Sequence, residues 1–189
     1  MNGFSRKTAV EVVQLARRGN VAAFKQLYQA YGDAVLRLVS GVLGSVDEGK
    51  DLTQDIFIRV FNKLPELKQP EAFNGWLKQL CIRMAIDQLR QRKQLVSDEV
   101  LESFETEPDW QQMTTALSDY EDMTRLMRGL TDSERFVVWL HVVEGYQHAE
   151  LAAMLDCSES AVRQRYRRAM SKLKTTLGEP AQDEQRTAI

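Results

Sequence analysis

The residues with the clearest chemistry lie near the C-terminal end of the sequence. Six side chains able to bond to the edges of DNA bases share one side of a predicted helix over 158–174: Ser158, Glu159, Ser160, Arg163, Gln164 and Arg167. Four cations suited to the phosphate backbone accompany them: Arg165, Arg168, Lys172 and Lys174. A basic amphipathic helix can also be simply solvated. The residues before it distinguish DNA binding from a solvated surface.

Those residues predict a helix-turn-helix. A first helix over 147–155 is joined by Asp156 and Cys157 to the basic helix, and Ser158 is placed to cap it. The apolar positions at i, i+4, i+7 and i+11 form its buried stripe: Val162, Tyr166, Ala169 and Leu173. In such a motif the second helix enters the major groove, so binding to duplex DNA is favoured over plain solvation.

Composition indicates a helical protein with two basic parts. Gly and Pro are sparse and no alternating β-pattern appears, which predicts an all-α fold. The formal net charge is −2, yet residues 97–124 hold nine Asp and Glu and no Lys or Arg. The rest of the chain then carries 25 Lys and Arg against 18 Asp and Glu, a charge of +7. This separation predicts two domains and an acidic linker, although on charge alone a merely solvated linker is equally plausible.

The first half divides into predicted helices over 8–18, 21–43, 47–64 and 73–93. The third of these has a broad apolar face, which includes Phe61, and a second stripe at i, i+3, i+4 and i+7: Asp51, Gln54, Asp55 and Ile58. An isoleucine among carboxylates suits a partner contact, but a solvated face with one stray Ile explains the stripe as well.

The fourth predicted helix carries its own polar stripe, made of cations, amides and an aromatic: Trp76, Gln79, Arg83, Asp87 and Arg90, with Arg92 and Lys93 at its end. Cations bind phosphates and an aromatic ring can stack on an unpaired base, so this face suits opened or single-stranded DNA. Trp76 borders the apolar face, and packing in the core explains this one residue equally well.

The remaining chemistry-bearing residues predict neither an enzyme nor a metal site. Cys81 and Cys157 have no disulfide or metal spacing, and His141 and His148 form no ligand set with them, so no cofactor and no metal are expected. The sequence shows neither the constellation of residues that activates a nucleophile nor a phosphate-binding loop. The sequence lacks a membrane-spanning stretch and its N-terminus lacks a signal peptide's apolar core, which predicts a cytoplasmic protein without membrane insertion.

Taken together, both halves resemble the extracytoplasmic-function (group IV) sigma-70 factors, the small promoter-recognition subunits of bacterial RNA polymerase. The resemblance covers about residues 8–177. In the first half it is carried by AFKQLYQAYGDAVLRL, DLTQDIFIRVF and FNGWLKQLCIRMAIDQLRQRK, and in the second by LTDSERFVVWL, EGY, AELAAML and SAVRQRYRRAMSKL.

The resemblance implies a division of labour along the chain. Residues 1–95 would be sigma region 2, which docks on core polymerase and reads and melts the −10 element. Residues 119–177 would be sigma region 4, which reads the −35 element. Residues 96–118 would be a linker that threads toward the active-site and RNA-exit channels, and residues 178–189 a disordered tail. Two further partners are implied besides promoter DNA: core polymerase, through its largest-subunit clamp helices and its flap region, and an anti-sigma factor.

The resemblance also implies roles for the stripes. Asp51, Gln54, Asp55 and Ile58 would meet the clamp helices, which favours the partner interpretation of the outward Ile. The loop 64–74, ending in Asn74, and the polar stripe of the helix after it (Trp76, Gln79, Arg83, Asp87, Arg90, Arg92, Lys93) would capture a flipped −10 base and hold the non-template strand. The −35 element would be read by Ser158, Glu159, Ser160, Arg163, Gln164, Arg167, Arg168 and Lys172.

Three positions depart from the family's pattern. Arg83 stands where Asn is common, which favours a phosphate contact over the usual −10 base contact, although Asp87 is kept. Gln147 replaces a Ser or Thr cap, and Asp156 stands where Gly is common in the turn; Asp tolerates left-handed backbone, so the turn should form. The competing hypothesis is a stand-alone helix-turn-helix regulator whose first half is a dimerisation or effector domain.

Overall fold

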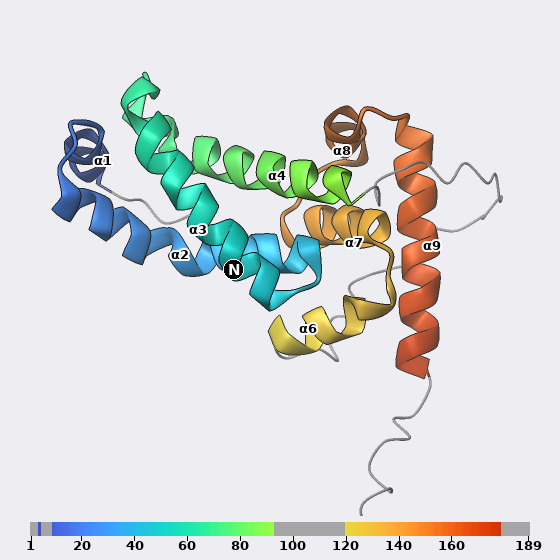
Figure 1. Cartoon of the computed structure of the whole chain (residues 1–189). Coiled ribbons are helices and arrows are strands. Elements are labelled where there is room, and N and C mark those ends of the chain that lie inside the picture. Colours follow the sequence, from blue (N-terminus) through green and yellow to red (C-terminus); the bar gives the residue numbers. More distant parts are fainter. Residues whose placement is uncertain (1–3, 5–8, 93–119, 179–189) are drawn as a thin grey trace, which may run out of the picture. The chain divides into compact units, whose positions relative to one another are not determined.

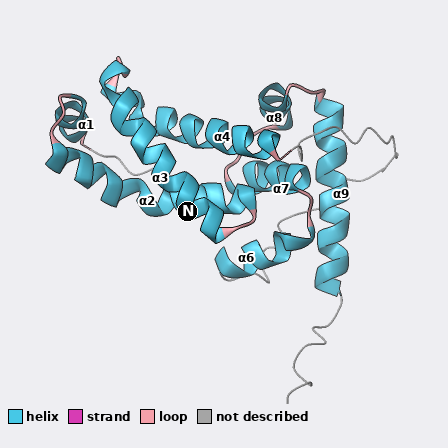
Figure 2. Cartoon of the chain, in the orientation of Figure 1, coloured by secondary structure: helices cyan, strands magenta, loops and turns pink. Residues whose placement is uncertain are grey.

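The computed structural model describes residues 4, 9–92 and 120–178 of the chain (Figure 1). The regular elements of these residues are helices, joined by short loops and turns (Figure 2). The predicted all-α class is therefore confirmed. The chain divides into two compact units, residues 1–97 and residues 98–189. In the described residues, none of the helices has the length and apolar character needed to cross a membrane. The predicted linker lies outside the described residues, and so does the predicted tail apart from Gly178, which ends the last helix.

Unit 1 is built around one long helix. Its elements are α1 (Val10–Arg17), α2 (Val21–Leu43), α3 (Val46–Lys63), the 3-10 turns η2 (Leu64–Glu66) and η3 (Pro70–Ala72), and α4 (Phe73–Gln91). α2 packs against α1, α3 and α4, so its buried face is the centre of the unit. The predicted helices agree with these bounds to within two residues at each end.

Local sequence explains where these helices begin and end. The Asn20 side chain accepts a hydrogen bond from the Ala23 amide at 2.9 Å, and Ser45 Oγ accepts one from the Glu48 amide at 3.3 Å. Both are N-terminal caps of the kind that Asn and Ser favour. Between them, Gly44 ends α2 with a φ of 71°, a conformation that costs glycine little.

The core of unit 1 is apolar and closely packed. Its fully buried members include Leu27, Tyr31, Ile56, Leu77 and Leu89. α2 and α3 approach so closely that a β-carbon at Gly49 would lie 2.8 Å from Ser40 Cβ and 3.0 Å from Ser40 Cα. Phe61 differs from the prediction, because it lies at the edge of the apolar face and remains 50% exposed, with its ring edge-on to Phe24 at 5.1 Å.

Unit 2 is a helix-turn-helix supported by shorter helices. Its elements are α6 (Tyr120–Leu126), the 3-10 turn η4 (Met127–Gly129), α7 (Asp132–Val138), the π-helix η5 (Trp139–Val143), α8 (His148–Leu155) and α9 (Glu159–Gly178). α9 packs against both α7 and α8. The predicted buried stripe of α9 is confirmed, since Val162, Tyr166, Ala169 and Leu173 are all buried.

The turn of the motif forms as the sequence predicts. Asp156 adopts a left-handed conformation with φ 55°, and the Ser158 hydroxyl accepts a hydrogen bond from the Ala161 amide at 3.2 Å. The Glu150 carboxylate accepts a bond from the Gln147 amide at 2.8 Å, so the start of α8 is capped without a Ser or Thr. The π-helix η5 was not predicted, because no residue in it breaks the apolar pattern.

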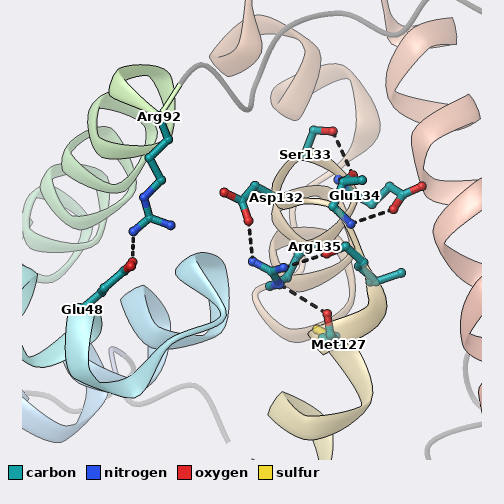
Figure 3. A network of polar contacts seen from close by, with 9 residues as sticks. Glu48, Arg92, Met127, Asp132, Ser133, Glu134 and Arg135 are labelled. Atoms are coloured by element: carbon teal, nitrogen blue, oxygen red, sulfur yellow. Dashed lines mark hydrogen bonds and ion pairs between the residues drawn. The ribbon is translucent and has the colours of Figure 1, made fainter.

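Charged groups lie inside unit 2, beside α7 (Figure 3). The Arg135 guanidinium is buried and contacts Asp132 at 2.7 Å, and it also donates to the carbonyls of Leu130 at 2.7 Å and Met127 at 3.3 Å. Glu134 is buried as well, and it accepts a hydrogen bond from the Thr131 amide at 2.9 Å. These bonds satisfy groups that would otherwise be costly to bury, and they join η4 to α7.

Candidate nucleic-acid interface

α3 presents its predicted polar stripe to solvent. Asp51, Gln54 and Asp55 are exposed, and Ile58 is 61% exposed, while Leu52, Ile56 and Val60 on the opposite side are buried. The helix is held by that buried face, so the stripe has no packing role within unit 1. Two carboxylates followed by an exposed aliphatic side chain can bind a partner surface that has a basic part and an apolar part next to it.

Aromatic side chains extend this exposed region. Phe61 lies one helical turn beyond Ile58 on α3, and Tyr28 of α2 is 45% exposed, with its ring 4.7 Å from that of Phe57. Its spacing from Leu27 and Tyr31 would predict Tyr28 on the core face of α2. Its exposure shows that the core face ends nearer to Leu27 and Tyr31, a boundary that periodicity alone cannot locate.

α4 presents the stripe predicted to meet opened DNA. Gln79, Arg83, Asp87 and Arg90 are exposed along it. Trp76 is half-buried, with its ring 6.0 Å from that of Phe73 at an angle of 37°, so part of its face remains accessible. The stripe therefore combines two guanidinium groups, an amide and an aromatic edge, which suits a flexible strand with unpaired bases.

Two other residues predicted to meet the −10 element, Arg92 and Lys93, are not shown as free exposed cations. Arg92 forms an ion pair with Glu48 of α3 (Figure 3), which neutralises part of its charge. Lys93 lies outside the described residues. Among the described residues, the exposed positive charge of this stripe therefore rests mainly on Arg83 and Arg90.

Asn74, in the first turn of α4, uses both ends of its amide within unit 1. Its Oδ1 accepts a hydrogen bond from the Tyr31 hydroxyl at 2.5 Å, and its Nδ2 donates to the Phe4 carbonyl at 3.0 Å. Phe4 and Tyr31 are buried. Sequence reasoning assigned Asn74 to DNA and missed both partners. No periodic signal could have found Phe4, which lies 70 residues away from Asn74 in the chain.

α9 presents its predicted polar residues at its N-terminal end. Ser158, Glu159, Ser160 and Arg163 are exposed, whereas Gln164, Arg167 and Arg168 are half-buried. The Arg163 guanidinium binds the Glu159 carboxylate, with Nη2 at 2.6 Å and Nε at 3.1 Å from Oε1. Exposed pairs of this kind contribute little net stability, so Arg163 can exchange Glu159 for an acceptor on DNA at small cost.

Lys172, also assigned to DNA, has a partner inside unit 2. Its Nζ lies 2.8 Å from both carboxylate oxygens of Glu134, whose side chain is 7% exposed against 49% for Lys172. The ammonium group therefore compensates a buried carboxylate and holds α9 against α7. The phosphate contact of Lys172 remains a prediction, and the structure gives this residue an internal partner.

Rings pack between the two helices of the motif and the π-helix. The imidazoles of His141 and His148 are stacked at 4.2 Å, and the Tyr166 ring lies 5.0 Å from the first and 5.2 Å from the second. His141 Nδ1 donates to the Tyr146 carbonyl at 2.7 Å. Burial raises the pKa of the Tyr146 phenol, and the neighbouring carboxylates of Glu144 and Glu150 raise it further. These contacts are those of a packed core edge.

No constellation for metal binding appears in the described residues. Groups of three or more His, Cys, Asp or Glu side chains with ligand geometry are absent from residues 9–92 and 120–178. Cys81 is buried, Cys157 is half-buried, and both are free thiols. The Arg165 guanidinium lies 3.5 Å from the Cys157 sulfur, which ties the turn of the motif to α9.

Comparison with known families agrees with this arrangement of two units. A family model described as Sigma-70 region 2 matches residues 27–94, and one described as Sigma-70, region 4 matches residues 120–173. The first match falls in unit 1 and contains the α3 and α4 stripes. The second falls in unit 2 and contains the helix-turn-helix.

Curated relatives and solved structures point the same way. The ECF RNA polymerase sigma factor SigE of Mycolicibacterium smegmatis is 26% identical over 170 residues, which are 88% of this chain and 66% of that protein. RfaY of Xanthomonas campestris pv. campestris, a probable RNA polymerase sigma factor, is 27% identical over 168 residues, 86% of this chain and 42% of that protein. The chain thus spans less than two thirds of the length of either relative.

A solved structure shares the fold at lower identity. The sigma factor RpoE from Bartonella quintana, in complex with the anti-sigma factor NepR, gives a TM-score of 0.54 at 22% identity, covering 83% of this chain and 98% of that one. The resemblance stated from the sequence is confirmed by both family matches and by the relatives. The chain belongs to the sigma-70 family of RNA polymerase sigma factors, in its extracytoplasmic-function group.

Proposed function

We propose that this protein directs core RNA polymerase to specific promoters and starts transcription there. Unit 1 docks on the clamp helices of the largest subunit and reads and melts the −10 element, and unit 2 reads the −35 element. The protein performs no bond chemistry itself; it acts by binding. Its place of action is the cytoplasm, where the polymerase and the promoter DNA are found.

The outward stripe of α3 carries this proposal. A stand-alone DNA-binding regulator needs no second surface of this composition, whereas a polymerase subunit does. Ile58 is 61% exposed at the end of a stripe that carries the exposed carboxylates of Asp51 and Asp55, and an aliphatic side chain in that position gains free energy only when a partner covers it. The acidic neighbours Asp51 and Asp55 favour a partner whose facing residues are basic.

The two DNA-facing stripes support different tasks. α9 offers hydroxyl, amide and guanidinium groups near its N-terminal end, where a recognition helix meets base edges in the major groove. α4 offers fewer cations and the half-buried Trp76, which suit a strand whose bases are unpaired. We infer that α9 reads duplex DNA at −35 and that α4 holds the opened non-template strand at −10.

An anti-sigma factor is the regulator that the comparisons favour. The matched RpoE structure contains one, bound to a protein of the same fold. We propose that a protein of this class binds the chain and covers the α4 and α9 stripes until an inducing signal releases it.

Run-off transcription with core polymerase on a library of genomic promoter fragments tests the function. We expect initiation at a small set of new sites when the protein is added, and weak DNA binding by the protein alone. Absence of any new initiation site would contradict the proposal. Tight binding to a palindromic duplex without polymerase, by a dimer of the protein, would favour the stand-alone regulator instead.

The docking surface is tested by the double variant Asp51→Ala with Gln54→Ala. We expect it to lose binding to core polymerase while keeping the helical circular dichroism and unfolding midpoint of the wild-type protein. The matched control is Gln26→Ala with Asp33→Ala, which removes the same two side-chain types from exposed positions of α2. Equal core binding by both double variants would remove α3 from the interface.

The reading role of α9 is tested by Arg163→Ala. Because a guanidinium can form two hydrogen bonds with one guanine, its loss should relax discrimination at one position of the −35 element by about tenfold. A uniform loss of affinity across all −35 sequences, with a weaker salt dependence, would identify a phosphate contact instead.

A further inference from the structure

We propose that Phe4 is a positioning residue of the −10-reading surface and that Asn74 holds this segment in place. In this arrangement Asn74 does not read DNA directly. Its amide fastens the backbone at Phe4 to the first turn of α4, so that the neighbouring Trp76 and Gln79 are presented in a fixed geometry. The inference rests on the function proposed above for α4 and adds a residue to it.

The orientation of the Asn74 amide is set by its partners. The Phe4 carbonyl oxygen can only accept a hydrogen bond, so the amide nitrogen of Asn74 must face it, at 3.0 Å. The amide oxygen then faces the Tyr31 hydroxyl, which donates to it at 2.5 Å. An amide bonded at both ends has lost its rotational freedom, so it holds Phe4 and Tyr31 at fixed positions relative to α4. An amide so engaged must break a bond before it can pair with a base edge.

Burial shows that this contact is part of the packed structure. Phe4 is 6% exposed and Tyr31 and Phe73 are also buried. The Tyr31 ring lies edge-on to Phe73 at 5.4 Å, and the Phe73 ring lies 6.0 Å from that of the half-buried Trp76. A continuous path of contacts therefore runs from Phe4 through Asn74 and Tyr31 to the aromatic side chain proposed to meet an unpaired base.

The loop before α4 is supported from the same side. α1 lies against both 3-10 turns, η2 and η3, which form the loop proposed to capture a −10 base. The match to the region 2 family model begins at residue 27, so Phe4 and α1 lie outside it. Tyr31 and Asn74 lie inside the match, so this contact joins residues of region 2 to a residue that precedes the match.

Variants of the full-length protein, assembled with core polymerase, test the proposal. Phe4→Ala removes the buried ring, and Asn74→Asp replaces the donor that faces the Phe4 carbonyl with an oxygen that repels it. The DNA is the strongest promoter found in the run-off library, with its own −10 element or with single-base changes in it. We expect both variants to lose about tenfold in discrimination between these templates, the size of one well-placed base contact.

Control variants separate positioning from general destabilisation. Phe4→Leu keeps an apolar side chain and should retain most of the discrimination, and Leu15→Ala truncates an exposed side chain of α1 and should leave it unchanged. Discrimination at the −35 element and the amount of polymerase complex formed should be unaltered in every variant. A variant that was merely less folded would lose −35 discrimination and polymerase binding along with −10 discrimination.

Three outcomes would overturn the inference. Unchanged −10 discrimination in Phe4→Ala and Asn74→Asp would mean that the contact has no role in reading. A second measurement is binding of a single-stranded oligonucleotide that carries the −10 sequence; tighter binding by Phe4→Ala than by the wild-type protein would mean that Phe4 competes with DNA. If Asn74→Asp lost −10 discrimination and Phe4→Ala kept it, Asn74 would contact DNA directly. The proposed function itself fails only if the wild-type protein starts no transcription.

Discussion

α4 in unit 1 and α9 in unit 2 each present a polar stripe, but different contacts hold them. α4 is fixed mainly by apolar and aromatic packing and by the neutral hydrogen bonds of Asn74, and its ion pair with α3, Arg92–Glu48, lies at its C-terminal end with side chains 26% and 42% exposed. α9 is fixed partly by charge, since Lys172 binds the buried Glu134 beside the buried Arg135–Asp132 pair. Unit 1 should therefore be sensitive to changes of shape, and unit 2 to changes of charge.

Arg135→Leu should have the largest effect. It leaves the Asp132 carboxylate, whose side chain is 10% exposed, without its counter-ion and the carbonyls of Leu130 and Met127 without their donor. Breaking a buried pair from one side costs about 3–5 kcal/mol, so unit 2 should lose most of its stability. Hydrogen exchange should accelerate in α7 and α9 while α2 and α3 keep their protection.

The double variant Asp132→Leu with Arg135→Leu is the control for this prediction. Replacing both charges with apolar groups avoids the unpaired carboxylate, so part of the lost stability should return. If the double variant is no more stable than Arg135→Leu alone, the bonds to the two carbonyls carry the effect and the ion pair does not.

Gly49→Ala tests the sensitivity of unit 1 to shape. The added β-carbon would lie 2.8 Å from Ser40 Cβ and 3.0 Å from Ser40 Cα, and α2 and α3 must move apart to admit it. Overpacking of this kind costs about 1–3 kcal/mol. The free energy of unfolding, followed by hydrogen exchange in α2 and α3, should fall while unit 2 is unchanged.

The size-swapped pair Ser40→Gly with Gly49→Ala should recover much of this loss. It removes the β-carbon that the new methyl group would meet, at a cost of about 1 kcal/mol for a glycine inside a helix. A double variant as unstable as Gly49→Ala would show that the α2 backbone, and not the Ser40 side chain, limits the approach.

Lys172→Met should lower the stability of unit 2 by less than the variants above, and Lys174→Met is its control. Lys172 compensates Glu134, but it is half exposed and Glu134 keeps its bond from the Thr131 amide, so the expected loss of unit 2 stability is about 1 kcal/mol. Lys174 is exposed and should affect only DNA binding, through the salt dependence of affinity. Equal urea midpoints for the two variants would contradict an internal role for Lys172.

Tyr146→Phe should have the smallest effect, visible only at high pH. The pKa of the Tyr146 phenol is raised, first by burial and then by Glu144 and Glu150. A group whose pKa is higher in the folded state favours folding while it stays protonated, and that contribution is lost as the pH rises above about 10, the ordinary pKa of tyrosine. Unit 2 of the wild-type protein should lose more stability between pH 9 and pH 11 than unit 2 of the variant, measured by urea unfolding at each pH.

The sequence was sufficient for the elements and for the stripes that face solvent. Helical periodicity placed Val162, Tyr166 and Leu173 inward and Ile58 outward, because these positions depend only on residues a turn or two away. The caps at Asn20 and Ser45 and the left-handed Asp156 follow from equally local rules.

What the sequence could not supply are contacts between distant residues. Lys172 meets Glu134 across 38 residues, and Asn74 meets Phe4 across 70. In both cases a polar residue on a predicted DNA-binding stripe has an internal partner, and no spacing rule distinguishes such a residue from its solvent-facing neighbours. The assignments of single residues to DNA therefore remain predictions, while the stripes themselves are properties of the fold.

The wide turn Trp139–Val143 also constrains the length of the chain between α7 and α8. It closes with bonds from the Glu144 amide to the Trp139 carbonyl at 3.3 Å and from the Tyr146 amide to the Leu140 carbonyl at 2.9 Å, so it takes up one residue more than an α-helical turn. Each residue of an α-helix turns the chain by about 100°. A single deletion here would therefore rotate everything that follows, and the rings of His148 and Tyr166 would leave His141. The number of residues in this turn, more than their identity, keeps the helix-turn-helix in phase with α7.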